Sequence, residues 1–242
     1  MSNLYIVATP IGHLKDITLR ALEILKSVDL ILCEDTRVAA KLLANYKIEK
    51  PSLSYHQHSE VGKLREIIEA LKEGKNLALI TDAGTPGISD PGNELIKKLL
   101  SYFSGISGNG TKVPGNISII PIPGPSAVTT ALSVSGLKAD EFLFLGFVPK
   151  KKGRGKFFHE IVESERTVVF YESSHRILKT LPELAKAFQQ VQANNNSYKQ
   201  IVVARELTKL HETIYRGTIK EVIENLAAGS TKGEFVVMVE GK

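Results

Sequence analysis

Short apolar runs alternate with amphipathic segments along the first half of the chain. The apolar runs at 4–8, 29–33, 53–56, 77–80 and 117–122 predict strands. Between them, the segments 14–27, 38–46, 59–74 and 93–103 repeat apolar residues at helical spacing. The run 77–80 contains no polar residue, which suits a parallel strand covered on both faces. Five strands alternating with helices therefore predict a parallel sheet with helices on both sides.

The pattern changes beyond Gly136. Before this point, Ser126 can cap a helix that runs to Ser135. Beyond it, strands are predicted at 142–147, 167–171, 201–204, 211–216 and 234–240, and helices at 156–164, 174–190 and 219–228. The strands 201–204 and 211–216 leave no room for a helix between them, so they should pair antiparallel. We therefore expect an α/β protein of two domains, residues 1–121 with a parallel sheet and residues 122–242 with a mixed sheet, and a binding cleft between them. The Gly-, Ser- and Asn-rich segment 104–116 is expected to lack regular structure.

A long loop follows the strand predicted at 77–80. Its sequence, TDAGTPGISDPG, contains Gly84 and Gly87, which permit positive φ and a close approach of the backbone to a ligand. Asp90 is placed to cap the next helix. Loops between a strand and a helix usually take about 2 to 6 residues, and open α/β sheets bind ligands at the carboxyl ends of their strands. We expect a ligand-binding loop here, although an ordinary turn would have a similar composition.

Composition narrows the class of protein. With 242 residues, 43% of them hydrophobic, the chain can build sizeable cores. No stretch approaches the roughly 20 apolar residues that span a bilayer, and the N-terminus does not resemble a signal peptide, so we expect a soluble cytoplasmic protein. The single cysteine, Cys33, excludes an internal disulfide, and no His or Cys pair has zinc-ligand spacing, so no metal is expected. The net charge of +5 is compatible with an anionic partner.

Charged residues follow two of the predicted strands. Asp35 could orient a substrate and Arg37 could hold a phosphate at the end of the strand 29–33. Alternatively, Asp35 only caps the next helix and Arg37 is solvated. In the second domain, Glu172 and His175 are candidates for acid–base chemistry, because histidine ordinarily exchanges its proton near neutral pH. A histidine at the start of a helix is, however, more often structural.

The sharpest charge feature is the basic loop, residues 150–156. It contains five cations separated by glycines: Lys150, Lys151, Lys152, Arg154 and Lys156. Such a flexible basic segment suits a phosphate backbone, so we expect it to contact RNA. The alternative is a solvated surface without a partner.

The chain carries a resemblance to a known family. It rests on seven segments that occur in the order LYIVATPIGHLKDIT, CEDTR, ITDAGTPGISDPG, IPIPGPSAV, FLFLGFVP, VVFYESSHR and VARELTKLHET and that extend over essentially the whole sequence. In these segments the chain resembles the ribosomal RNA small subunit methyltransferase I family, the ribose 2′-O-methyltransferase branch of the tetrapyrrole methylase superfamily. The resemblance implies two α/β domains that bind S-adenosylmethionine, a homodimer, and methylation of a cytidine 2′-hydroxyl in 16S rRNA of the small ribosomal subunit.

Carried over position by position, the resemblance implies cofactor contacts in both domains. These are Pro10, Ile11, Thr85, Ile88, Ser126, Ala127, Tyr171 and Ala204, and their place in the central loop adds Asp82 and Gly84. Tyr171 could instead be an ordinary core aromatic. Members that methylate tetrapyrroles have an acidic residue where this chain has Thr85.

Two other functions fit parts of the sequence. A tetrapyrrole methyltransferase would share the cofactor but would have no use for the basic loop. A non-catalytic RNA-binding module would use the basic loop but would not need two Gly- and Pro-rich loops at strand ends.

Overall fold

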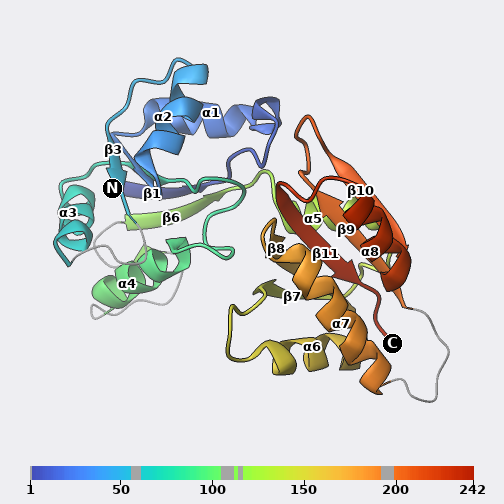
Figure 1. The fold of residues 1–242 in the computed structure, drawn as a ribbon. Coiled ribbons are helices and arrows are strands. Elements are labelled where there is room, and N and C mark those ends of the chain that lie inside the picture. The colour runs from blue at the N-terminus through green and yellow to red at the C-terminus, as the bar shows by residue number, and fades with distance from the viewer. Residues whose placement is uncertain (1, 56–60, 105–111, 114–116, 192–198) are drawn as a thin grey trace. The chain divides into compact units, whose positions relative to one another are not determined.

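The computed structural model describes residues 2–55, 61–104, 112–113, 117–191 and 199–242 (Figure 1). The chain divides into two compact units, Met1–Ser126 and Ala127–Lys242. None of the described helices combines the length and the apolar character needed to cross a membrane. Both units are layered α/β structures, as the alternation of strands and helices predicts.

The first unit is built on a six-stranded sheet with the order β3-β2-β4-β1-β6-β5. The strands are β1 (Ser2–Val7), β2 (Leu30–Cys33), β3 (Ser52–Ser54), β4 (Leu77–Leu79), β5 (Lys112–Val113) and β6 (Ile117–Ile122). Five of them are parallel, as predicted, whereas β5 pairs antiparallel with β6. The expectation that 104–116 lacks regular structure is therefore wrong at Lys112–Val113, where the backbone pairs with the open edge of β6. Residues 105–111 and 114–116 lie outside the described residues.

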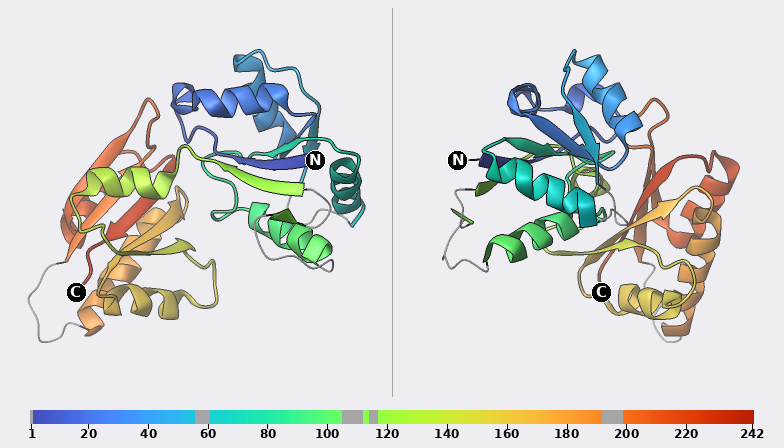
Figure 2. Two further views of the ribbon diagram at one scale, coloured as in Figure 1. Left: turned by 180° about the vertical axis from the view of Figure 1, so that it is seen from behind. Right: turned by 90° about the vertical axis from the view of Figure 1, so that its left-hand side faces the viewer.

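Helices cover both faces of this sheet (Figures 1 and 2). Helices α1 (Leu19–Ser27) and α2 (Thr36–Asn45) lie on one face, and α3 (Val61–Lys72) and α4 (Gly92–Ser104) lie on the other. Strand β4 shows why both faces need cover. Leu77 and Leu79 pack in the core under α3 and α4, whereas Ala78 and Ile80 pack in the core under α1 and α2.

The predicted helix 14–27 is interrupted. A single 3-10 turn, η1 (Leu14–Asp16), comes first, and α1 begins only after Thr18, whose hydroxyl accepts a hydrogen bond from the backbone N–H of Ala21. This cap sets the start of α1 because it satisfies an N–H that would otherwise have no partner. The predicted strand 53–56 and helix 59–74 extend into residues 56–60, which lie outside the described residues.

The second unit contains a five-stranded sheet with the order β10-β9-β11-β8-β7. The strands are β7 (Phe142–Phe147), β8 (Thr167–Ser173), β9 (Gln200–Arg205), β10 (Thr213–Thr218) and β11 (Glu234–Val239). Strands β7 and β8 are parallel, and β11 lies antiparallel between β8 and β9. Strands β9 and β10 pair antiparallel, which confirms the predicted mixed sheet.

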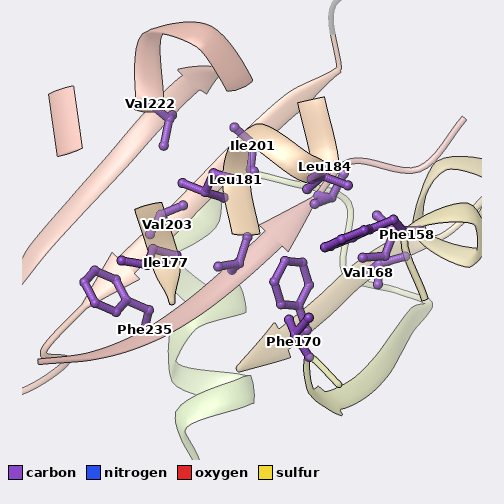
Figure 3. Packing of buried hydrophobic residues seen from close by; sticks show 14 of the residues in the cluster. Phe158, Val168, Phe170, Ile177, Leu181, Leu184, Ile201, Val203, Val222 and Phe235 are labelled. Carbon is purple, nitrogen blue, oxygen red and sulfur yellow. The ribbon is translucent and has the colours of Figure 1, made fainter. Parts of the chain in front are cut away.

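The core of the second unit lies between this sheet and three helices, α6 (Arg154–Glu163), α7 (Ile177–Val191) and α8 (Ile219–Ala228). Figure 3 shows Phe170 and Phe235 pointing from the sheet toward the helices. The opposite face is covered by α5 (Ala127–Ser135), which packs against β11 (Figure 2). Since β7, β8 and β9 run in the same direction, their carboxyl ends lie along one edge of the sheet. The loops after β7 and β8 carry Lys150, Lys151, Lys152 and His175 of the site residues predicted in this unit.

Candidate functional site

Two loops at the carboxyl edge of the first sheet are joined by paired backbone hydrogen bonds. The N–H of Thr9 donates to the carbonyl of Gly84 at 2.9 Å, and the N–H of Gly84 donates to the carbonyl of Thr9 at 3.1 Å. The Thr9 hydroxyl also donates to the carbonyl of Thr81 at 3.0 Å. Gly84 has a φ of 85°, and a Cβ on it would lie 3.4 Å from the Ile11 side chain. The loop after β1, with Pro10 and Ile11, and the loop after β4 therefore form one rigid assembly.

The loop after β6 joins the same assembly. The Thr85 hydroxyl donates to the carbonyl of Pro125 at 3.0 Å, immediately before Ser126. The loop after β6 also packs against the loop after β1. A Cβ on Gly124 would lie only 3.0 Å from the Cβ of Ala8, so this close packing needs a glycine at position 124. The structure thus brings Pro10, Ile11, Gly84 and Thr85 to one edge together with the segment that leads into Ser126.

Asp90 shapes the far end of the loop after β4. Its Oδ1 accepts hydrogen bonds from the backbone N–H of Gly87 at 2.8 Å and of Gly92 at 2.6 Å. The expected cap at the start of α4 is therefore present. Between these contacts, Ser89 adopts a φ of 60° and Ile88 is 47% exposed. The loop thus presents an apolar side chain to the outside.

At the end of β2, Asp35 caps α2. Its Oδ1 accepts a hydrogen bond from the backbone N–H of Arg37 at 2.8 Å, and its Oδ2 pairs with Nη2 of Arg37 at 2.6 Å. The helix-cap interpretation of Asp35 is confirmed, and Arg37 is solvated, with 86% of its side chain exposed. These bonds with Arg37 hold the pKa of Asp35 at about 2, so this carboxylate stays ionised. A phosphate that bound Arg37 would have to compete with Asp35.

Two further carboxylates lie beside Asp35. Oδ1 of Asp82 accepts a hydrogen bond from the backbone N–H of Asp35 at 3.3 Å. Partial burial, and to a lesser extent the charge of Asp35, raises the pKa of Asp82. Partial burial also raises the pKa of Glu34, with a further contribution from Asp82. Within the described ranges, His, Cys, Asp and Glu side chains form no group of three or more suited to holding a metal ion.

Cys33, at the end of β2, is a small core residue. It is 1% exposed, and burial raises the pKa of its thiol to about 11. The thiol is therefore protonated at neutral pH and a poor nucleophile.

In the second unit, Tyr171, Val236 and Ala204 lie side by side on β8, β11 and β9. The Tyr171 ring makes edge contacts with Phe144 and Phe147, at 5.0 and 5.2 Å between ring centroids. Burial raises the pKa of Tyr171 to about 12, although a hydrogen bond with the backbone of Val128 acts in the opposite direction. Since Val128 follows Ala127, three predicted cofactor residues (Ala127, Tyr171 and Ala204) lie on the face of the sheet that α5 covers.

Glu172 points the other way, into the interior. Its side chain is 0% exposed and forms an ion pair with Nη2 of Arg176 at 2.7 Å. Oε1 also accepts a hydrogen bond from the backbone N–H of Ser173 at 2.7 Å, and Oε2 accepts one from the Thr180 hydroxyl at 2.7 Å. His175 lies in the turn between β8 and α7 and is exposed. The two candidates for proton transfer in this unit are therefore in opposite environments.

The basic loop divides into exposed and internal cations. Lys150, Lys151, Lys152 and Lys156 are exposed. Arg154 is directed inward, with only 14% of its side chain exposed.

The partners of Arg154 were not predicted from the sequence. Its guanidinium pairs with Glu183 at 2.7 Å and donates to the Thr180 hydroxyl at 3.1 Å. A signal for Thr180 exists in the sequence, because this residue interrupts the apolar face that Ile177, Leu181 and Leu184 form on α7.

The comparison with known families defines the class of this protein. The sequence profile of the Tetrapyrrole (Corrin/Porphyrin) Methylases matches residues 3–223. Solved structures with the same fold include a cobalt precorrin-4 methyltransferase of cobalamin biosynthesis, 19% identical with a TM-score of 0.66 over 98% of this chain and 94% of that one. A uroporphyrin-III C-methyltransferase from Thermus thermophilus has 17% identity and a TM-score of 0.62 over 98% and 93% of the two chains. The chain belongs to the tetrapyrrole methylase family.

Closer relatives identify the branch within this family. Proteins named ribosomal RNA small subunit methyltransferase I are 43% identical in Synechocystis sp., 47% in Haemophilus influenzae and 39% in Thermotoga maritima. The matches cover 99–100% of this chain and 80%, 78% and 100% of the respective relatives. The chain therefore belongs to the ribosomal RNA small subunit methyltransferase I family.

Proposed function

We propose that this protein transfers a methyl group from S-adenosylmethionine to the ribose 2′-hydroxyl of a cytidine in 16S rRNA. The observation that carries the proposal is the similarity to the ribosomal RNA methyltransferases, which extends over essentially the whole chain at 39–47% identity. The enzyme would act on the small ribosomal subunit, in the cytoplasm and as a homodimer.

The joined loops of the first unit suit S-adenosylmethionine. Gly84 has no side chain, so a ligand can approach the backbone closely there. The exposed side chain of Ile88 offers an apolar surface. The neighbouring carboxylates of Asp35 and Asp82 would attract a cationic compound. We propose that Pro10, Ile11, Asp82, Gly84, Thr85, Ile88 and Ser126 contact the cofactor in this unit. Ala127, Tyr171 and Ala204 would contribute from the second unit, where they share one face of the sheet.

The cofactor, when bound, would supply a methyl group attached to a sulfonium, and the rest of the cofactor would leave as a neutral thioether. The tasks left to the chain are to align the hydroxyl and to remove its proton. Among the carboxylates of the first unit, Asp82 suits the role of base better than Asp35, because its pKa is raised whereas that of Asp35 is held at about 2. His175 remains a candidate because it is exposed, and Arg37 a candidate for holding a phosphate of the substrate.

We assign the RNA contact to the basic loop. Lys150, Lys151 and Lys152 are exposed and lie between β7 and α6, whereas residues 154–156, expected to be part of a loop, form the first turn of α6, where Lys156 is also exposed. Exposed lysines that are close together in the sequence can each neutralise a phosphate without reading the nucleotide sequence. Arg154 would contribute only after giving up its contacts with Glu183 and Thr180.

The direct test is incubation of the purified protein with small ribosomal subunits that lack the modification and with labelled S-adenosylmethionine. We expect label in the 16S rRNA and one linkage that becomes resistant to alkaline cleavage, because a methylated 2′-oxygen cannot attack the neighbouring phosphate. A uroporphyrinogen-type macrocycle serves as the control acceptor. Label in the macrocycle but not in the RNA would overturn the proposal.

A further inference from the structure

Two arginines hold the backbone at the base of the basic loop. Nη1 of Arg176 donates to the carbonyl of Val148 at 2.8 Å, and Nη1 of Arg154 donates to the carbonyl of Pro149 at 2.9 Å. These two carbonyls are consecutive, and the next residue is Lys150. The path of the chain into the lysines is therefore set by guanidinium groups rather than by sheet pairing alone.

Both arginines are connected to the same buried carboxylate. Arg176 pairs directly with Oε1 of Glu172, and Arg154 is linked to Oε2 through the hydroxyl of Thr180. Glu183 gives Arg154 a second anchor at 2.7 Å. We call Arg154, Glu172, Arg176, Thr180 and Glu183 the loop clamp. A buried carboxylate with several charge-assisted hydrogen bonds holds its partners in a narrow range of positions, because breaking any one bond leaves a buried charge uncompensated.

We propose that Glu172 is a positioning residue of the loop clamp, which fixes the base of the basic loop so that Lys150, Lys151 and Lys152 meet the phosphates of RNA. The inference depends on the RNA contact proposed above. It also gives Glu172 a different role from that of a base. Both of its oxygens already accept hydrogen bonds from the protein, and its side chain is 0% exposed, so a ribose hydroxyl has no access to it.

The substitution Glu172→Gln separates these roles. Glutamine keeps the shape of the side chain but loses the charge that holds Arg176. If Glu172 is a positioning residue, the KM for small subunits rises about three- to tenfold while kcat changes by less than about twofold. Loss of a general base would instead lower kcat by about a hundredfold or more at an unchanged KM, and that result would overturn the proposal.

A double-mutant cycle tests whether the clamp acts through the lysines. Thr180→Val removes the hydroxyl that joins Glu172 to Arg154 at nearly constant volume. It is made alone and together with Lys150→Ala, Lys151→Ala and Lys152→Ala. We expect Thr180→Val to weaken RNA binding about threefold or more in the parent chain and to have no further effect in the triple variant. An equal effect in both backgrounds would mean general destabilisation and would overturn the proposal.

The controls keep the outcomes apart. Glu141→Gln removes an exposed ion pair with Arg166 in the same unit and should change neither RNA nor cofactor affinity.

If Thr180→Val fails to fold, as judged by thermal unfolding, Arg176→Lys takes its place, because lysine cannot contact both Val148 and Glu172 as the guanidinium does. If the triple variant binds RNA normally, the proposed RNA contact fails. If the triple variant binds weakly but the clamp variants bind normally, the clamp proposal alone fails.

Discussion

Neighbouring carboxylates at the end of β2 and β4 differ in their surroundings. Asp35 has the guanidinium of Arg37 and a backbone N–H as partners, and its pKa is held at about 2. Partial burial raises the pKa values of Asp82 and Glu34, and in Asp82 it outweighs the opposing effects of the Asp35 backbone N–H and of the charge of Arg37. The same small region therefore contains one carboxylate whose pKa is lowered and two whose pKa is raised, and divergent pKa values of this kind are often found at functional sites.

The raised pKa of Asp82 predicts a pH-dependent effect on stability. Because its ionised form is disfavoured in the folded protein, Asp82 costs stability once the pH rises through its folded pKa, and costs nothing below its ordinary pKa of 3.8. Asp82→Asn should therefore raise the free energy of unfolding at pH 7, and by less than at a fully buried site because solvent still reaches this side chain. Denaturant unfolding at pH 7 and at about pH 3.5 measures the difference, which should be clearly smaller at the lower pH.

Asp16→Asn, at an exposed position of η1, is the matched control for this measurement. It should be neutral at both pH values. A gain for Asp82→Asn that persisted at low pH would have to come from something other than the charge.

At the scale of the elements, the joined loops of the first unit depend on Thr9, which is 1% exposed. We predict that Thr9→Val destabilises the protein by about 1–3 kcal/mol, because the carbonyl of Thr81 loses its buried donor. Calorimetric titration should also show weaker binding of S-adenosylmethionine.

Thr129→Val, on α5, tests whether any Thr to Val change has this effect. It lies outside the joined loops and should leave cofactor affinity within about twofold of the parent value. Unchanged cofactor binding by Thr9→Val would separate the loop assembly from the cofactor site.

Local patterns predict most of these elements, and long-range contacts explain what they miss. The apolar run ending at Ile80 predicts β4, because such a run fits only a strand covered on both faces. The break between η1 and α1 at Thr18 is harder to predict. The apolar spacing continues across it, and only the hydrogen bond of the Thr18 side chain sets the start of α1. Strand β5 has two residues, too few for any periodicity, and forms because β6 has an open edge.

The candidate site follows the same rule. Sequence reasoning finds the loops, because Gly84 and its neighbouring prolines are local signals. It cannot find that Thr9 pairs with Gly84, because the two residues lie 75 positions apart. It also cannot tell that Glu172 is enclosed by Arg176 and Thr180, since α7 must first pack against β8.

At the scale of the whole molecule, the exposed lysines predict how RNA binding responds to salt. Removing one lysine that neutralises a phosphate should reduce the slope of log affinity against log salt concentration by about 0.7 to 0.9. The combined change of Lys150, Lys151 and Lys152 to Ala should therefore weaken binding at low salt and reduce this slope by about 2 to 3, while S-adenosylmethionine affinity stays the same. Filter binding to small subunits at several salt concentrations provides the measurement.

Lys97→Ala and Lys98→Ala on α4 form the control, because they remove charge from a helix surface rather than from the basic loop. Their slope should match that of the parent protein. If both the α4 variant and the basic-loop variant reduced the slope equally, net charge alone would explain the salt dependence of RNA binding.

The strand order of the first unit has a consequence for how the protein is made. Strand β1 precedes every other strand of its sheet along the chain, yet it lies between β4 and β6, and Ser2 pairs with Ile117. The last neighbour of β1 in the sheet is therefore available only after β6 has been synthesised, and such long-range pairing slows folding. Until β6 is present, one edge of β1 has no partner for its backbone hydrogen bonds, and an unpaired edge of this kind can pair with other chains.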